Sequence, residues 1–474
     1  MPEDLQEFIE ELEDRGMLVR VKEKVSVDLE LAEVVRRVFK AGGPALLFEN
    51  VEGFDIPVAA NLFGSPERVL MALEAANVDE VVGRLEALVR VVGKLSLRSA
   101  LRGLRALKSA RPKLVRRAPC KEKVFDQQGF KLTKLPAIRS WPKEAGRFIT
   151  LPLVFTRDPE TGRRNVGIYR MQVFDDASAG MHWQLHKHGA LHLSKSRGPL
   201  EVAVALGGDP ALTLAAAMPL PEAVDEVVMA GLLKGSSMKL VKCESVDLEV
   251  PASAEIVLEG TVDPRELRVE GPFGDHTGYY TPPKPCHVFR LRCATMKEHS
   301  VFPAWVEGRP PTEGAVLQGL FQRIALPLIK ALLPEVVDVN FPAEACFHGM
   351  CVVSIKKRYP GHAERVMMGL WGLEAFSLVK VIVVVDEDVD VHDLGQVLWA
   401  ASTRVDPARD LLIIERAPLD ELDHASPVLG LGSKLGVDAT RKVEGEVDRP
   451  TPEELRVDEE VARRIDELWP KLGL

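Results

Sequence analysis

The stretch Glu270-Gly-Pro-Phe-Gly-Asp-His-Thr-Gly-Tyr-Tyr280 places two acids five residues apart around a Gly-Pro-Phe-Gly turn. A helix would separate such positions by about 140° around its axis, and a strand would place them on opposite faces. The two glycines admit backbone angles that other residues avoid, and the proline fixes one torsion. We therefore expect Glu270 and Asp275 to converge on one cavity.

Converging carboxylates are suited to proton transfer. When like charges crowd a poorly solvated site, the pKa of one acid rises, which leaves an acid beside a base near neutral pH. The alternative is an ordinary surface turn with scattered acids. His276, Thr277, Tyr279 and Tyr280 follow directly, and because such residues bond or stack, they favour a functional loop.

Composition narrows the class of protein. A chain of 474 residues suggests two or three domains. The net charge of -9, with acids and bases interleaved, argues against nucleic-acid binding; the basic stretch 98–123 is interpreted as a solvated helix and linker. Apolar runs such as 381–385 have strand length, short of the ~20 residues that a bilayer needs. The start Met1-Pro-Glu-Asp does not resemble a signal peptide.

The side-chain inventory points to a cytoplasmic enzyme. The six cysteines lack paired CxxC spacing, so we expect reduced thiols. Five Asn and eight Gln among many Glu, Arg, Val and Leu indicate a heat-adapted protein.

Periodicity predicts mixed α/β and β architecture in four parts. Residues 1–115 form an α/β domain, with helices at 5–16 and 29–41 and strands at 18–21 and 45–48. Residues 116–310 begin with a Pro-rich linker to about 150 and continue as a β-rich domain, a barrel or sandwich. Its expected elements are strands at 151–156, 166–174, 200–206, 239–243, 256–260 and 287–294 and one helix at 221–234.

Residues 311–450 form a second α/β domain with a covered sheet. Its expected elements are helices at 317–333, 363–371 and 391–401 and strands at 336–341, 351–355 and 379–385. In residues 451–474, Thr451-Pro-Glu-Glu454 reads as a capping box that starts a helix running to about Leu472. Its apolar stripe of Val461, Ile465, Leu468 and Trp469 is expected to pack on another subunit.

Two polar clusters precede the acid turn. Asn165-Val-Gly-Ile-Tyr-Arg-Met-Gln172 carries two amides and a guanidinium, and Met181-His-Trp-Gln-Leu-His-Lys-His188 carries three imidazoles, followed by His192. Histidine is a common ligand for divalent metals, although an isolated histidine is more often structural. Glu226 offers a further oxygen donor on the predicted helix 221–234.

These motifs together resemble the UbiD family of decarboxylases. The matching runs, in order, are 147–152, 165–172, 182–188, 242–243, 250–255, 270–280 and 432–440. The resemblance covers nearly the whole chain. It implies a reversible carboxy-lyase that uses prenylated FMN, held by a central split β-barrel related to flavin reductases.

The resemblance also implies roles for residues. The catalytic set is Arg170, Glu270 and Asp275, with Asp275 where some fungal members have Glu. A divalent ion, typically Mn, bridges to the cofactor phosphate and is held by Asn165, His186 and Glu226; the spacing leaves His182 and His188 as alternatives to His186. The flavin pocket adds Ile168, Tyr169, Gln184, Met218 and Lys434, with a potassium ion near Ala215 and Met218.

Elementary chemistry agrees with those roles. A phosphate is a hard anion, and Mn held by an amide oxygen, a carboxylate and an imidazole is a reasonable anchor for it. Arg170 can bind a substrate carboxylate through two parallel bonds, which a lysine cannot. The flavin supplies the electron sink for loss of CO2. We expect Asp275 to donate the proton, and Glu270 to tune Arg170 and keep the cofactor active.

The leading hypothesis for the substrate is trans-anhydromevalonate 5-phosphate, giving isopentenyl phosphate, as in archaeal members; the alternative is an aromatic acid of the 3-polyprenyl-4-hydroxybenzoate type. A flavin prenyltransferase would supply the cofactor, and a homodimer or homohexamer is expected. Two other functional classes make different predictions. A flavin reductase using plain FMN lacks support because no GxGxxG fingerprint occurs. A non-enzymatic assembly factor leaves Arg170, Glu270 and Asp275 without a role.

Overall fold

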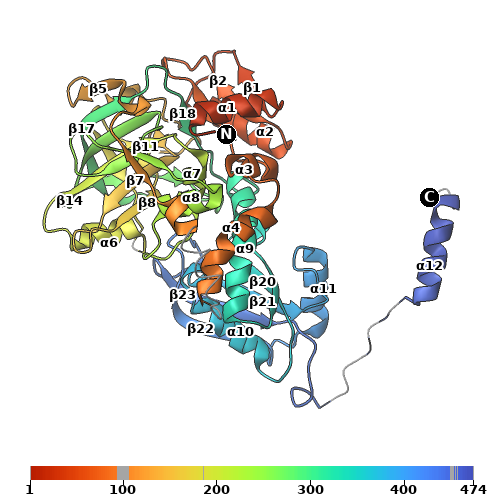
Figure 1. Cartoon of the computed structure of the whole chain (residues 1–474). Coiled ribbons are helices and arrows are strands. Elements are labelled where there is room, and N and C mark those ends of the chain that lie inside the picture. The colour runs from red at the N-terminus through yellow and green to blue at the C-terminus, as the bar shows by residue number, and fades with distance from the viewer. Residues whose placement is uncertain are drawn as a thin grey trace.

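The computed structural model describes residues 2–92, 106–184, 186–347, 349–448, 453, 455 and 457–472. An N-terminal unit and a β-rich central unit lie side by side, and a C-terminal α/β unit lies below them in Figure 1. The helix α9 (Glu313–Leu332) runs from the N-terminal unit to the C-terminal one, beside α4 (Val78–Val92). The mixed α/β and β class expected from the sequence is confirmed.

The N-terminal unit is a small sheet covered by amphipathic helices. Helix α1 buries Leu5, Phe8, Ile9 and Leu12, as its spacing predicts, and Asp4 caps its first turn. The sheet order is β1-β2-β3-β18, so a strand that comes after the last strand of the central sheet completes this N-terminal sheet. The other elements are β1 (Leu18–Val21), α2 (Glu30–Lys40), β2 (Ala45–Phe48), β3 (Val58–Ala60), α3 (Pro66–Ala72) and β18 (Phe302–Ala304).

The central unit is built on a nine-stranded sheet of order β6-β9-β10-β17-β14-β11-β7-β8, with β5 pairing with β17. The longest strands, β14 (Ile256–Glu270) and β17 (Lys284–Met296), pair antiparallel and lead into and out of the acid turn. The shorter strands are β5 (Lys123–Asp126), β6 (Phe148–Ile149), β7 (Pro152–Arg157), β8 (Arg164–Ile168), β9 (Met171–Val173), β10 (Ser178–Met181) and β11 (Leu200–Leu206).

The strand predicted at 166–174 is broken in two. Strand β8 pairs with β7 at one end of the sheet, and β9 pairs with β6 and β10 at the other. Only Tyr169 and Arg170 connect them. The two ends of the sheet are therefore brought together at Arg170, an order compatible with the expected split barrel.

The C-terminal unit confirms the predicted second α/β unit. Its sheet has the order β19-β20-β21-β23-β22, in which the three middle strands are parallel. Separate apolar clusters cover its two faces, as expected for near-continuous apolar strands. Its elements are β19 (Val336–Asn340), β20 (Met350–Ile355), α10 (His362–Trp371), β21 (Val381–Asp386), α11 (Leu394–Arg404), β22 (Leu411–Pro418) and β23 (Leu431–Asp438).

Several expectations need correction. The strand predicted at 256–260 runs on to Glu270, and the helix predicted at 221–234 begins only at Glu226. The expected linker from residue 116 to about 150 contains strands β5 and β6, and β4 lies just before it. Helices α6 and α7 were not predicted. The elements not yet given bounds are β4 (Lys113–Val115), α6 (His188–Lys195), α7 (Pro210–Ala217), α8 (Glu226–Lys234), β12 (Lys239–Lys242), β13 (Glu249–Pro251), β15 (Phe273–Gly274) and β16 (Tyr280–Thr281).

The final helix also differs at its start. Helix α12 (Glu459–Leu468) begins after Asp458, whose carboxylate accepts from the amides of Glu460 and Val461. The predicted capping residues Thr451, Pro452 and Glu454 lie outside the described residues. Figure 1 shows α12 apart from the three units, and none of its residues is buried. Packing on another subunit stays a prediction.

Within the described part of the chain, α9 is the one helix long and apolar enough to cross a membrane by length and composition. It places Leu317, Leu320 and Ile324 in the same core as the N-terminal helices. We therefore interpret it as a core helix between units. The six cysteines are all free, as expected.

Candidate active site

The acid turn brings its two carboxylates to one guanidinium. Arg170 donates from Nε to Glu270 Oε1 at 3.0 Å and from Nη1 to Asp275 Oδ2. Both acids are almost fully buried, at 1 % and 6 % exposure. The expected convergence of Glu270 and Asp275 is thus found, and the three residues implied as the catalytic set lie together.

The glycines of the turn serve different purposes. Gly271 has φ +89°, in the left-handed region. Gly274 has no such angle, but a Cβ there would lie 2.1 Å from Cδ1 of Trp141. The short strands β15 and β16 then pair across the turn, and the Thr281 hydroxyl donates to Asp275 Oδ2 at 3.1 Å.

The expectation that one acid has a raised pKa is wrong for this resting site. Burial alone would raise the pKa of Glu270, but a hydrogen bond from His182 and the charge of Arg170 outweigh it and lower the pKa to about 2. Burial likewise opposes ionisation of Asp275, yet His276 and Arg170 hold its pKa well below the usual range. A cation between the two acids replaces like-charge repulsion with attraction, so both are carboxylates.

Two histidines belong to this cluster. His182 Nδ1 lies 3.0 Å from Glu270 Oε2, and burial lowers the His182 pKa, so the neutral ring donates from Nδ1. His276 approaches Asp275 Oδ1 with its amide at 2.8 Å and its Nδ1 at 2.9 Å. Burial lowers the pKa of His276, but the hydrogen bond and charge of Asp275 raise it more. His276 therefore supports the ionised form of Asp275.

The site contains polar atoms that the described residues leave unsatisfied. Arg170 Nη2, His182 Nε2 and Trp183 Nε1 are buried and have no hydrogen-bond partner within the described ranges. Unsatisfied buried groups are rare because they cost free energy. The donor of Arg170 and the acceptor of His182 belong to side chains that bind the two acids, so together they suit a polar ligand.

The acid turn also lies where the central and C-terminal units meet. Thr277 Oγ1 is 3.2 Å from His424 Nε2, and the rings of Tyr279 and His424 are 5.1 Å apart. Lys284 Nζ binds Glu421 Oε2 at 2.6 Å. Contacts from the C-terminal unit thus reach the second half of the turn and the start of β17 after it.

The predicted metal ligands are partly assembled. Asn165 and Glu226 are both buried, and the Val166 amide, next to Asn165, donates to Glu226 Oε2 at 3.0 Å. Burial raises the pKa of Glu226 to about 7, and it has no salt bridge within the described residues. The buried carboxylate of Glu226 and the side-chain amide oxygen of Asn165 are suitable ligands for a divalent cation. Such a cation would offset the cost of ionising Glu226.

The third predicted ligand is less defined. His186 is exposed, and no described contact joins it to Asn165 or Glu226. His182 is engaged with Glu270, and His188 Nε2 lies 3.9 Å from Glu374. The imidazole linked to Asn165 is instead His192, since the Thr156 hydroxyl contacts His192 Nδ1 at 2.9 Å and Asn165 Nδ2 at 3.4 Å. The described residues contain no group of three His, Cys, Asp or Glu side chains placed to hold a metal.

Of the other predicted cofactor residues, four lie in the central unit and Lys434 lies in the C-terminal unit. Tyr169 is buried, and its hydroxyl accepts from Asn165 at 3.4 Å. Ile168 ends β8 and Met218 follows α7, both packed against one core, and Gln184 is buried. Lys434, however, donates to the carbonyls of Ser377 and Val379 at 2.7 and 2.8 Å, inside the C-terminal unit. Burial lowers its pKa to about 8.

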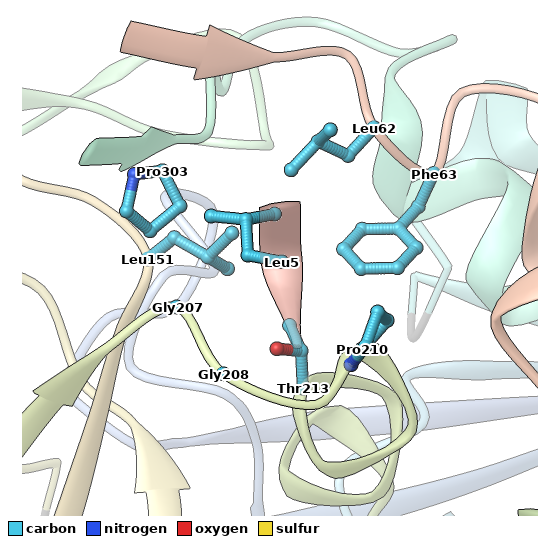
Figure 2. A pocket seen from close by; sticks show the side chains of 9 residues that line it. All are labelled: Leu5, Leu62, Phe63, Leu151, Gly207, Gly208, Pro210, Thr213 and Pro303. Carbon is cyan, nitrogen blue, oxygen red and sulfur yellow. The ribbon is translucent and has the colours of Figure 1, made fainter. Parts of the chain in front are cut away.

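A small cavity lies elsewhere, between the N-terminal and central units. Figure 2 shows apolar side chains around it, with the backbone of Gly207 and Gly208 on one side. Its volume of about 10 Å³ suits one water molecule at most. It shares no residue with the acid turn, so we give it no part in the chemistry.

Residues near the turn that sequence reasoning missed include Glu144, Trp141 and Thr281. Glu144 is 4 % exposed and accepts from the Gly274 amide at 3.1 Å. It is a lone acid in a loop, and only its place in Trp-Pro-Lys-Glu-Ala-Gly146, before a strand, sets it apart.

Comparison with protein families gives three matches in chain order. Residues 9–88 match the N-terminal domain, residues 113–310 the Rift-related domain and residues 315–439 the C-terminal domain of the 3-octaprenyl-4-hydroxybenzoate carboxy-lyase (UbiD) models. An uncharacterized protein of Archaeoglobus fulgidus is 49 % identical over 99 % of this chain and 98 % of its own length.

Solved structures show the same architecture. Vanillic acid decarboxylase of Sedimentibacter hydroxybenzoicus, in its closed form, is 31 % identical with a TM-score of 0.87 over 100 % of both chains. An evolved dimeric form of the UbiD-class enzyme HmfF of Pelotomaculum thermopropionicum, in complex with prenylated FMN, is 31 % identical with a TM-score of 0.79 over 98 % of both chains.

Proposed function

Because this chain belongs to the UbiD family of 3-octaprenyl-4-hydroxybenzoate carboxy-lyases, we propose that it releases CO2 from an α,β-unsaturated acid at the Arg170 site, reversibly and without net oxidation. The chain is a carboxy-lyase, and its structural neighbours include decarboxylases. One observation carries the proposal: a buried guanidinium holds two carboxylates and keeps one N–H group unsatisfied.

Arg170 is the proposed substrate clamp. A substrate carboxylate that accepted from Nη2 would satisfy that donor and compete with Asp275 for the guanidinium. Phe273 limits where the guanidinium can move, because Arg170 lies over its ring at 4.3 Å. Glu270, bonded to both Arg170 and His182, keeps Arg170 oriented during that exchange.

Asp275 is the proposed proton donor. In the resting site Arg170 favours its carboxylate form, so it must first take up a proton. Weakening of the Arg170 contact by the substrate would raise the pKa of Asp275, because burial then opposes its charge with less compensation. The acid could protonate the carbon that loses CO2, and one proton from solvent would reload it in each turnover.

Prenylated FMN, when bound, would supply the electron sink for decarboxylation. The proposed holding residues are Ile168, Tyr169, Gln184 and Met218, with Asn165, His186 and Glu226 for a divalent ion, manganese by preference, at its phosphate. A potassium ion near Ala215 and Met218 is part of the same proposal. Lys434 can bind the cofactor only if it gives up its hydrogen bonds to the carbonyls of Ser377 and Val379.

For the substrate, trans-anhydromevalonate 5-phosphate leads and a 4-hydroxybenzoate-type acid is second. The 49 % identical archaeal relative fits the first; the structural likeness to vanillic acid decarboxylase favours the second. Protein co-expressed with a flavin prenyltransferase should be assayed for CO2 release from each acid. The released cofactor should have the mass of prenylated FMN. If protein loaded with that cofactor turns over neither acid, both substrate proposals are contradicted.

A flavin reductase remains a rival on the same fold. It predicts oxidation of NAD(P)H by protein carrying plain FMN, whereas the proposed enzyme should be silent with NAD(P)H. An assembly factor predicts that the protein stays colourless after co-expression with the prenyltransferase. Absorbance and the mass of the released cofactor distinguish these outcomes.

A further inference from the structure

Glu144 connects a loop of the central unit to the acid turn. Its side chain is 4 % exposed. Oε1 accepts from the Gly274 amide at 3.1 Å, and Oε2 accepts from the amides of Ser140 at 2.6 Å and Trp141 at 3.2 Å. One carboxylate therefore joins residue 274, the neighbour of Asp275, to the loop.

The loop and the turn are joined at further points. The Ala145 amide donates to the Pro272 carbonyl at 3.2 Å, opposite in direction to the Glu144 bond. The Trp141 ring fills the space that a side chain at Gly274 or Gly308 would need. Its Nε1 donates to the Glu307 carbonyl at 3.0 Å. The loop thus holds the turn through the packed Trp141 ring, through one backbone–backbone bond and through the bond from the Gly274 amide to the Glu144 side chain.

The chemistry of this contact requires an acceptor-only group. Three amides point at the Glu144 carboxylate, which can accept from all of them. Burial raises the Glu144 pKa, and the three amides together with the charge of Arg170 lower it in part. No salt bridge reaches Glu144 within the described part of the chain. The amides of Ser140, Trp141 and Gly274, rather than a counter-ion, therefore fix the position of the Glu144 carboxylate.

We propose that Glu144 is a positioning residue for Asp275, acting through the Gly274 amide to hold the acid turn in the shape that presents Asp275 to Arg170. This inference rests on the proposed decarboxylation. Without the bond to Glu144, the Gly274 amide has no other described acceptor, and Asp275 is attached to a less constrained backbone.

The test uses Glu144→Gln against a matched control. Gln has one acceptor oxygen, and its NH2 group cannot accept from an amide. Glu259 is also buried, at 0 % exposure, and accepts from the amides of Glu244 and Ser245 at 2.8 and 2.6 Å, without contact to the acid turn. Glu259→Gln therefore repeats the same chemical change at a remote loop.

We expect kcat to fall roughly 10- to 100-fold in Glu144→Gln with little change in KM, as for a displaced catalytic group, and to stay near wild type in Glu259→Gln. Glu144→Asp, which keeps the acceptors, should recover part of the loss. Hydrogen–deuterium exchange should be faster for residues 270–280 in Glu144→Gln only.

Unchanged kcat in Glu144→Gln, or equal losses in both Gln variants, would overturn the positioning role. The exchange measurement needs no turnover. If wild type releases no CO2 from any acid tested, the proposed function fails. Slower hydrogen–deuterium exchange of the acid turn in wild type than in Glu144→Gln would still support the positioning role of Glu144. Equal exchange in the two proteins would remove it.

Discussion

Arg170 binds Asp275 through Nη1 while its other terminal nitrogen, Nη2, stays buried without a hydrogen-bond partner among the described residues. The resting site therefore contains an ion pair that a substrate carboxylate can replace and a donor to which that carboxylate can bind. A single arginine performs both tasks because its planar group offers five N–H donors in fixed directions.

Arg170→Lys should separate charge from geometry. The ammonium keeps the positive charge but cannot reach both acids and a substrate in one plane, so we expect kcat/KM to fall by roughly 100-fold or more, about 3 kcal/mol of transition-state stabilisation. Steady-state kinetics of the cofactor-loaded enzyme measure this. Arg290→Lys is the control, since Arg290 pairs with Glu266 in an exposed position. A loss in the control as large as in Arg170→Lys would indicate a general effect of the change.

Asp275→Asn should abolish turnover and keep the flavin bound. The amide preserves size, and its one oxygen can still accept from His276, but its NH2 group cannot accept from Thr281 or Arg170 and it cannot deliver a proton. A loss of about 10²- to 10⁴-fold is typical for removal of a general acid. Product formation and the visible spectrum of the purified variant are the two measurements. Normal turnover would remove Asp275 from the mechanism.

The acid turn shows how far sequence reasoning reached. Two glycines and a proline between Glu270 and Asp275 were enough to predict that the acids converge, because only a turn avoids the spacing of helix and strand. The raised pKa was wrong, since local sequence does not reveal that Arg170, a hundred residues away from Glu270, lies between the acids. The role of Arg170 came from a family resemblance rather than from its neighbours.

The fold shows a similar division. Helix α1 and strands β1 and β2 were predicted within about two residues, because their periodicity and caps are local signals. Helix α7 was missed since it is buried on nearly all sides and has no polar face to set a period. The break at Tyr169 and Arg170 was missed because apolar residues lie on both sides of it; strand pairing with distant partners decides where β8 ends.

Glu313→Gln should change the pH dependence of stability. Glu313 opens α9, its Oε1 accepts from the Phe63 amide at 2.9 Å, and Oε2 is buried without a described partner. Burial raises its pKa from 4.5 to about 7. The folded state therefore holds the proton more tightly than the unfolded state, so this group destabilises the fold as the pH rises from about 4.5 to 7, by at most ~3 kcal/mol.

Gln resembles the protonated acid and does not titrate. The difference in Tm, variant minus wild type, should therefore be small at pH 5 and grow by several degrees toward pH 8. Thermal unfolding of both proteins across this range measures it. Glu298→Gln is the control, because Glu298 is exposed and the Lys123 hydrogen bond lowers its pKa. A difference in Tm that is flat with pH would contradict the assignment.

Metal binding should identify the imidazole ligand. We expect Asn165→Ala, Glu226→Gln and His186→Ala each to reduce Mn per chain in the purified enzyme, because each removes one donor. His192→Ala keeps all three proposed ligands and should retain the metal. Elemental analysis after co-expression with the prenyltransferase gives the ratio. Loss of metal in His192→Ala with retention in His186→Ala would transfer the role to His192, the ring that shares the Thr156 hydroxyl with Asn165.

The terminal helix should control assembly. Val461 and Ile465 of α12 and Trp469, which directly follows the helix, are spaced four residues apart and are 53, 39 and 53 % exposed in the single chain. Exposed apolar area of this kind costs about 25 cal/mol per Å² relative to its burial, so a neighbouring subunit is the expected cover. Ile465→Glu and Trp469→Glu should lower the particle mass measured by light scattering, and Arg463→Glu, on another face, should not. An unchanged mass in all three variants would mean that the subunits associate through other surfaces.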